Sequence, residues 1–177
     1  GVELGVACFP MIRPGGGDFN YNSEEFDVMW GDIRGCRELG CPGIVAGAQR
    51  SDGSLDVGLM KRIVQEAGPM AVTCHKVFDQ VPDPSSALEV LIEAGCARVL
   101  TSGLHANALE GARIIKQLVA QAAGRIVGMQ GGGARRGNIE EIIGSSGATE
   151  SHSSAVTANQ RAHTAHLKEW QSLVQAQ

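Results

Sequence analysis

Residues 70–103, MAVTCHKVFDQVPDPSSALEVLIEAGCARVLTSG, contain the pattern that decides the fold. A β-branched apolar run at residues 70–76 predicts a strand, and a second run at residues 98–101 predicts another. Between them, residues 85–94 have the spacing of an amphipathic helix, and Gly95 ends it. A strand, a helix and a strand in this order form a right-handed crossover, so the two strands are expected to lie parallel in one sheet.

The same alternation extends over most of the 177-residue chain. Further strands are predicted at residues 6–12, 43–48, 125–129 and 148–152, and further helices at residues 24–39, 56–67, 107–123 and 139–144. Six strands alternating with five helices indicate an α/β fold with a parallel sheet. A doubly wound open sheet and a (β/α)₈ barrel both fit this pattern, although a barrel of eight units typically takes about 250 residues.

Composition excludes several classes of protein. The chain has 15 Lys and Arg against 19 Asp and Glu, a net charge of −4, and no basic block. It therefore lacks the electrostatic footprint of a nucleic-acid partner. Its apolar runs are far shorter than the roughly 20 residues that span a membrane, and the chain does not start with a signal-peptide pattern.

The five cysteines match no common zinc spacing. They are Cys8, Cys36, Cys41, Cys74 and Cys96. In the absence of a secretory signal, they are interpreted as reduced thiols of a cytoplasmic protein. Each is expected to act mainly as a small buried apolar residue.

Polar side chains follow five of the six predicted strands. In parallel α/β folds the carboxyl ends of the strands meet at one edge, where sites form. The residues concerned are Arg13 and Asp18, then His75, Lys76 and Asp79, then residues 101–103, 130–133 and 150–154. Their recurrence predicts one shared polar mouth.

Two of these strand ends are typical of anion-binding loops. A run of three glycines follows the fifth strand, and a serine-rich segment follows the sixth. Backbone N–H groups in such loops converge on phosphate in many barrels, and nearby cations add charge. The predicted anion site consists of Arg13, Lys76, Gly131, Gly132, Gly133 and Ser153. Alternatively, the glycine run is only a tight turn, since no nucleotide-binding fingerprint accompanies it.

A metal or acid–base centre is a further hypothesis. Glu150 and His152 share one face of the last predicted strand, and His75 follows the third strand. Imidazole and carboxylate together suit Zn, Cu or Fe. The alternative for each of the three is a hydrogen-bonded structural role. No G-x-S-x-G motif supports serine-hydrolase chemistry.

These strand-end sequences resemble the CutC family, which is named for copper homeostasis. The similar blocks are distributed in order over about residues 6–155. They are MIRP (11–14), GGDF (16–19), DIR (32–34), TCHKVFD (73–79), RVLTSG (98–103), ALEG (108–111), GRIV (124–127), GGG (131–133) and SGATE (146–150), followed by His152 and Ser154. The chain departs from the family pattern at Gly15 and Lys76, where the family has Arg, and at Gln130, where it has Pro.

The resemblance implies a TIM-like (β/α) barrel over residues 1–155 and a cytoplasmic copper homeostasis protein that binds copper. The family's barrel begins with two further strands, which carry Glu-x-Cys and Glu-Leu-Cys elements that this chain lacks. We therefore expect an N-terminally incomplete member with six parallel strands, without the first two βα units. The cysteines most naturally assigned to Cu(I) are among the missing residues. Residues 156–177 match poorly and are expected to form a divergent helical tail.

The expected partner is a copper ion or a small anionic ligand, with His75, Glu150 and His152 as the metal set. The alternative is a TIM-barrel enzyme that acts on a phosphorylated or carboxylated metabolite, because fold alone does not determine function. Two open sheet edges, left by the missing units, would also favour a homo-oligomer.

Overall fold

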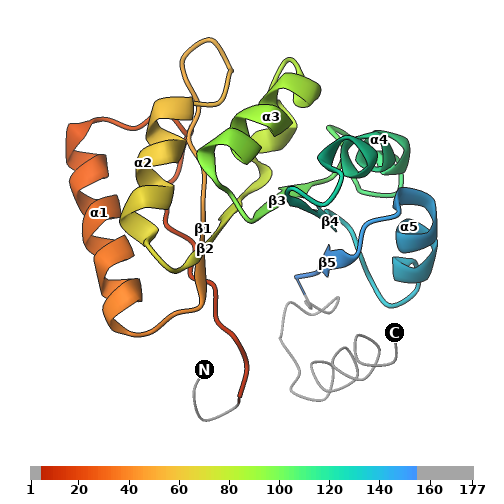
Figure 1. The fold of residues 1–177 in the computed structure, drawn as a ribbon. Coiled ribbons are helices and arrows are strands. Elements are labelled where there is room, and N and C mark those ends of the chain that lie inside the picture. Colours follow the sequence, from red (N-terminus) through yellow and green to blue (C-terminus); the bar gives the residue numbers. More distant parts are fainter. Residues whose placement is uncertain (1–4, 155–177) are drawn as a thin grey trace.

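Five parallel strands, hydrogen-bonded in the order of the sequence, form the sheet of the protein. The structure is a computed structural model, and it describes residues 5–154. The strands are β1 (Gly43–Ala46), β2 (Ala71–Cys74), β3 (Arg98–Thr101), β4 (Val127–Gly131) and β5 (Glu150–His152). The helices are α1 (Ser23–Glu38), α2 (Val57–Ala67), α3 (Pro84–Ala94), α4 (Ala112–Ala122) and α5 (Ile139–Ser146), with a 3₁₀ helix η2 (Lys76–Gln80) (Figure 1). The predicted α/β class with a parallel sheet is confirmed. The predicted tail, residues 156–177, lies outside the described residues.

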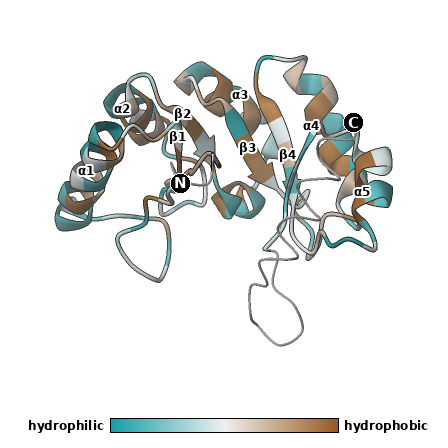
Figure 2. Ribbon diagram, turned by 90° about the horizontal axis from the view of Figure 1, so that it is seen from below, coloured by the Kyte–Doolittle hydropathy of each residue, from teal (hydrophilic) through white to brown (hydrophobic). Residues whose placement is uncertain are grey.

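The helices follow one another along the outer side of the curved sheet. Figure 2 shows α1 to α5 arranged in an arc, with the strands along its inner side. Each helix packs against the next one in the sequence. Because every crossover places its helix on the same side, the other side of the sheet is concave, and no helix of residues 5–154 covers it, as in a barrel wall.

The expected sixth strand, residues 6–12, is corrected to a single isolated bridge between Met11 and Val45. The Val45 N–H donates to the Pro10 oxygen at 2.8 Å. To continue this parallel ladder, the backbone nitrogens of residues 10 and 14 would have to donate. Both residues are prolines, which have no N–H. The sheet of the described residues therefore has five strands, with this segment beside β1.

α1 begins at Ser23, one residue earlier than the predicted helix at residues 24–39. The Asn22 side chain accepts hydrogen bonds from the N–H groups of Glu24 (2.9 Å) and Glu25 (3.0 Å). The Glu25 carboxylate in turn accepts from the Asn22 N–H at 2.8 Å. This reciprocal capping box satisfies three backbone donors, so Asn22 is the cap and Ser23 is the first helical residue.

The predicted helix at residues 107–123 is shorter, because α4 starts only at Ala112. The preceding residues form turns across the end of β3. There Gly111 lies against the backbone of residue 102, and a Cβ at Gly111 would come within 1.9 Å of the Ser102 oxygen. The Ala108 N–H donates to the Gly132 oxygen at 2.9 Å. These contacts tie the segment to the glycine loop after β4.

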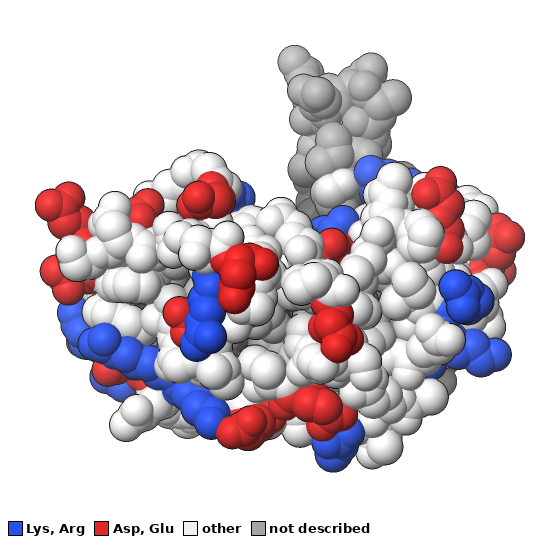
Figure 3. All heavy atoms as spheres, turned by 90° about the horizontal axis from the view of Figure 1, so that it is seen from above, with Lys and Arg blue, Asp and Glu red and all other residues white. Residues whose placement is uncertain are grey.

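The main core lies between the sheet and its helices. Ile12 and Cys74 point into it, as the alternation of side chains along a strand predicts. Other fully buried side chains are Met29, Ile33, Ile44, Met60, Ile63, Phe78, Leu88 and Leu91. Figure 3 shows that positive and negative side chains are interspersed over the face seen there. Among residues 5–154, no helix has both the length and the apolar character that crossing a membrane requires.

Candidate functional site

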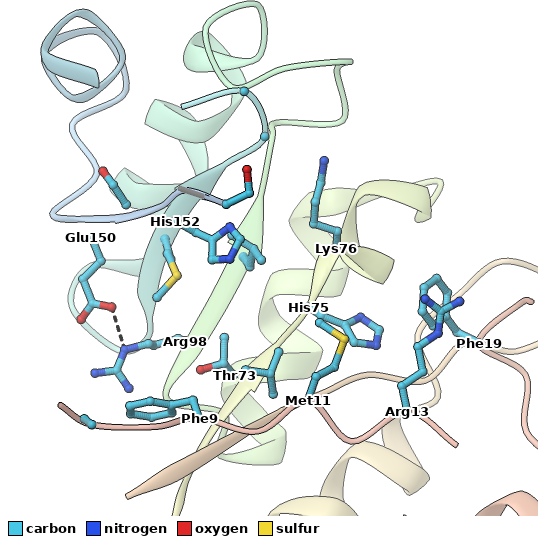
Figure 4. A pocket seen from close by; sticks show the side chains of 18 of the residues that line it. Phe9, Met11, Arg13, Phe19, Thr73, His75, Lys76, Arg98, Glu150 and His152 are labelled. Carbon is cyan, nitrogen blue, oxygen red and sulfur yellow. Dashed lines mark hydrogen bonds and ion pairs between the residues drawn. The ribbon is translucent and has the colours of Figure 1, made fainter. Parts of the chain in front are cut away.

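A cavity of about 730 Å³ opens on the concave side of the sheet. All five strands contribute to its wall, as does the segment before α1 (Figure 4). Its charged and imidazole-bearing lining residues are Arg13, His75, Lys76, Arg98, Arg135, Glu150 and His152. Most of the sequence-predicted site residues therefore face one cavity. The exceptions are Gly131 and Ser153, which do not line it.

Lys76 lies at the glycine loop after β4. Its Nζ is 3.4 Å from an Asp79 oxygen, and a Cβ at Gly132 would come within 3.2 Å of the same Nζ. Gly132 and Gly133 have positive φ angles, 105° and 77°, which favour glycine. Burial and then the Lys76 charge lower the pKa of His152. The structure thus brings together Lys76, Gly132, Gly133 and His152 at the mouth of the cavity.

Asp79 holds this mouth together. Its carboxylate accepts from the Thr101 hydroxyl, from the Ser102 N–H at 3.0 Å and hydroxyl at 2.8 Å, and from the Leu104 N–H at 3.2 Å. It thereby fixes η2 to the end of β3. Asp79 was expected among the polar strand-end residues but not in the anion or metal site. Its position in the TCHKVFD block (residues 73–79) is the feature of the sequence that could have indicated a role in the site.

Arg13 and Arg135 bring two more guanidinium groups to the cavity. Arg13 lies over the Phe19 ring at 4.6 Å and donates to the Gly17 oxygen at 2.8 Å. Arg135, which does not follow a predicted strand directly and was not among the expected site residues, donates to the Ala134 oxygen at 2.7 Å. A backbone oxygen and an aromatic ring therefore hold the Arg13 side chain, and a backbone oxygen holds that of Arg135.

Gly131 and Ser153 act behind the cavity wall. A Cβ at Gly131 would come within 2.6 Å of Leu100 Cδ1, so this glycine permits close packing of β3 against β4. The Ser153 hydroxyl donates to the Ala134 oxygen at 2.8 Å and so fastens the loop that follows the glycines. Neither residue lines the cavity, and both contact residues that form its wall or its rim.

The predicted metal set does not come together as one centre. Glu150 accepts from Arg98 Nε at 2.7 Å, and Figure 4 shows this pair, beside Phe9, away from Lys76. Among residues 5–154, no three His, Cys, Asp or Glu side chains form a group that could hold a metal ion. His75, Glu150 and His152 therefore do not fit a bound copper ion in this structure.

His75 is instead a buried, neutral imidazole. Its Nδ1 accepts from the Val77 N–H at 3.2 Å, which places the ring proton on Nε2. Burial, reinforced by the Arg13 charge, lowers the pKa of His75 from 6.5 to about 4. Nε2 is buried and has no hydrogen-bond partner among the described residues. The cavity wall thus contains an unsatisfied neutral donor.

Comparison with known proteins identifies the family. The sequence matches the CutC family over residues 2–157. The chain belongs to the CutC family. A CutC family protein of Xylella fastidiosa is 47% identical over 153 residues, which are 86% of this chain and 57% of that protein. The human "copper homeostasis protein cutC homolog" is 48% identical over 150 residues, which are 85% of this chain and 55% of that protein.

A solved CutC structure has the same fold. The crystal structure of a CutC protein from Streptococcus agalactiae aligns with a TM-score of 0.77 at 31% identity, over 80% of this chain and 70% of that chain. This confirms the resemblance drawn from the strand-end blocks. The chain spans less than two thirds of the length of the two curated CutC relatives described above.

The buried imidazole of this CutC chain predicts a pH-dependent stability. The pKa of His75 is about 4 when folded and near 6.5 when unfolded, so the unfolded state binds the proton more tightly. This contribution to stability is complete above pH 6.5 and is lost as pH falls towards 4, by about 3 kcal/mol. Urea unfolding from pH 7 to 4 measures it. His75→Asn, whose Oδ1 can replace Nδ1 as acceptor, should show a flatter dependence; an equally steep one would contradict the assignment.

Proposed function

We propose that this chain takes part in copper homeostasis in the cytoplasm and that its pocket binds a small anionic ligand. Relatives from human and mouse that carry the copper homeostasis name support the first part. One observation carries the second part: among residues 5–154, four cationic side chains, Arg13, Lys76, Arg98 and Arg135, and one carboxylate, Glu150, line the cavity. This excess of positive charge occurs in a chain of net charge −4.

The arrangement of these charges favours an anion at the Lys76 end. Arg98 is compensated by Glu150 at 2.7 Å, whereas Lys76 is 3.4 Å from Asp79, a carboxylate that already accepts from β3 and the loop after it. Gly132 and Gly133, which line the cavity beside Lys76, bring backbone N–H groups to this end. A charged group beside several fixed N–H donors in a concave site is the arrangement that binds phosphate and carboxylate groups.

The pocket is proposed for the anion and not for the copper ion itself. Cu(I) prefers thiolate ligands, and no cysteine lines the pocket. We further propose that the longer relatives complete a TIM-like barrel with additional βα units between β5 and the segment beside β1. Among residues 5–154, β1 and β5 are the two end strands of the five-stranded sheet, and the relatives are long enough to hold these further units.

The anion proposal predicts a selective effect of Lys76→Gln. The substitution removes a charged donor, so the affinity for phosphate should fall by about tenfold or more. Isothermal titration of the wild type and the variant with inorganic phosphate, and then with citrate, measures the change. Lys61→Gln is the matched control, because Lys61 pairs with Glu93 on the helical side at 2.5 Å. Equal loss in both variants, or none in Lys76→Gln, would refute the site.

The copper role is tested separately in cells. Cells that lack the full gene should grow less well at raised copper concentrations, and the wild-type gene should restore growth. Unchanged copper tolerance on deletion would contradict the role without bearing on the anion site.

A further inference from the structure

Cys36 and Cys41 lie together where α1 ends. The Cys41 N–H donates to the Cys36 oxygen at 3.0 Å, and the intervening Gly40 has a φ of 68°. This is the geometry of a Schellman motif, in which the side chains at these two positions contact each other across the end of the helix. The spacing of five residues between Cys36 and Cys41 matches no common metal motif, but the way the helix ends brings the two thiols into contact.

The two thiols differ in exposure but share one environment. Cys36 is 9% exposed and belongs to the main core, whereas Cys41 is partly buried and packs against that core. Burial and then the interaction with the Cys41 thiol raise the pKa of Cys36, with smaller contributions from Asp32 and Cys8. Cys36 is thus a protonated thiol, in contact with a second thiol that solvent can reach.

We propose that Cys36 and Cys41 form a two-thiolate site for Cu(I). On binding, each S–H proton is released to solvent, two Cu–S bonds form, and the metal stays Cu(I), so no oxidant or reductant is needed. Thiolates are the soft ligands that Cu(I) prefers, and two of them suffice for its linear coordination. Structural zinc requires four ligands, and residues 5–154 offer no group of even three.

The position at a helix end adds to the preference for a cation. The carbonyl groups at the C-terminus of α1 give that end a partial negative charge, which stabilises positive charge nearby. Neither cysteine lines the pocket, so this site is separate from the proposed anion site. The choice of copper rests on the proposed copper role. The predictions of copper binding here and of anion binding in the pocket can nevertheless be refuted independently of each other.

A second pair of cysteines provides a matched control. Burial and then the nearby Cys96 thiol raise the pKa of Cys74, and the two residues are 0% and 3% exposed. The Cys74 thiol is directed to the His75 oxygen at 3.6 Å, and burial raises the pKa of Cys96 to about 12. Because solvent does not reach either thiol, this pair should not bind Cu(I) in the folded protein.

Competition with bicinchoninate under anaerobic, reducing conditions tests the proposal on the full chain. The wild type should take one Cu(I) from the Cu(I)–bicinchoninate complex, and native mass spectrometry should show the one-copper adduct. Cys36→Ala and Cys41→Ser should each weaken binding by at least about 100-fold, since losing a ligand costs more than losing an outer-shell partner. Cys74→Ala should bind as the wild type does. Melting curves by circular dichroism should show that Cys41→Ser is folded and that Cu(I) raises the Tm of the wild type but not that of Cys41→Ser.

Three results would overturn the site. The first is wild-type affinity in Cys41→Ser. The second is loss of binding in Cys8→Ser while the variants at Cys36 and Cys41 still bind, which would assign the copper to the exposed Cys8 alone. The third is a Cys36–Cys41 disulfide, formed in air, in a protein that takes up no Cu(I) when reduced.

Discussion

Replacing Gly111 by alanine should destabilise the protein by at least about 3 kcal/mol. The new Cβ would come within 1.9 Å of the Ser102 oxygen and 2.9 Å of Gly103 Cα. Both are backbone atoms, so no side-chain rotation relieves the clash. Gly103 is similarly constrained, with a φ of 68° and its own Cβ position 2.3 Å from the Gly111 oxygen. Urea unfolding followed by circular dichroism measures the loss.

Gly144→Ala is the matched control for this prediction. Gly144 lies inside α5, and nothing lies within 4 Å of the Cβ that alanine would add. Alanine there should stabilise the protein by up to about 1 kcal/mol, because glycine lowers helix stability. A Gly111→Ala protein that unfolds at the wild-type urea concentration would show that the two segments are not in close contact.

Asp79→Ala should cost about 3–5 kcal/mol of stability. The Asp79 side chain is 11% exposed and accepts from Thr101, Ser102 and the Leu104 N–H. Its removal leaves these donors without an acceptor, and Thr101 and Ser102 are both buried. Buried donors that lose their partner impose their full desolvation cost. Because η2 is then released from β3, the phosphate affinity should fall as well.

Asp83→Ala separates this effect from the simple loss of an aspartate. Asp83 caps α3, accepting from the Ser85 and Ser86 N–H groups at 3.0 and 3.2 Å on the exposed surface. Its removal should cost about 1 kcal/mol and leave phosphate binding unchanged. If Asp79→Ala is no more destabilising than Asp83→Ala, the network around Asp79 is not what fixes the mouth.

The alternation of strands and helices could be predicted from the sequence, because the apolar repeat of a strand and that of an amphipathic helix both depend only on neighbouring residues. The expected first strand was wrong for a non-local reason. Pro10 and Pro14 are visible in the sequence, but the register that puts their nitrogens in the donor positions against β1 is not. The start of α4 likewise depends on the approach of Gly111 to residue 102, which periodicity does not encode.

The candidate site, like the fold, could be predicted from the sequence only in part. The convergence of Lys76 with the glycine loop follows from parallel topology, because the strand ends meet at one edge. Glu150, by contrast, was assigned to a metal set because the sequence could not reveal Arg98, 52 residues away, as its partner. The contact between Cys36 and Cys41 was also hidden, since it depends on the way α1 ends.

A crystal soaked in tungstate, a heavy analogue of phosphate, tests the central claim most directly. The anomalous map should show a peak between Lys76 Nζ and the N–H groups of Gly132 and Gly133, and this peak should be absent in Lys76→Gln. Tungstate bound only at exposed arginines elsewhere, with no peak at the glycine loop, would contradict the claim that this pocket binds an anion.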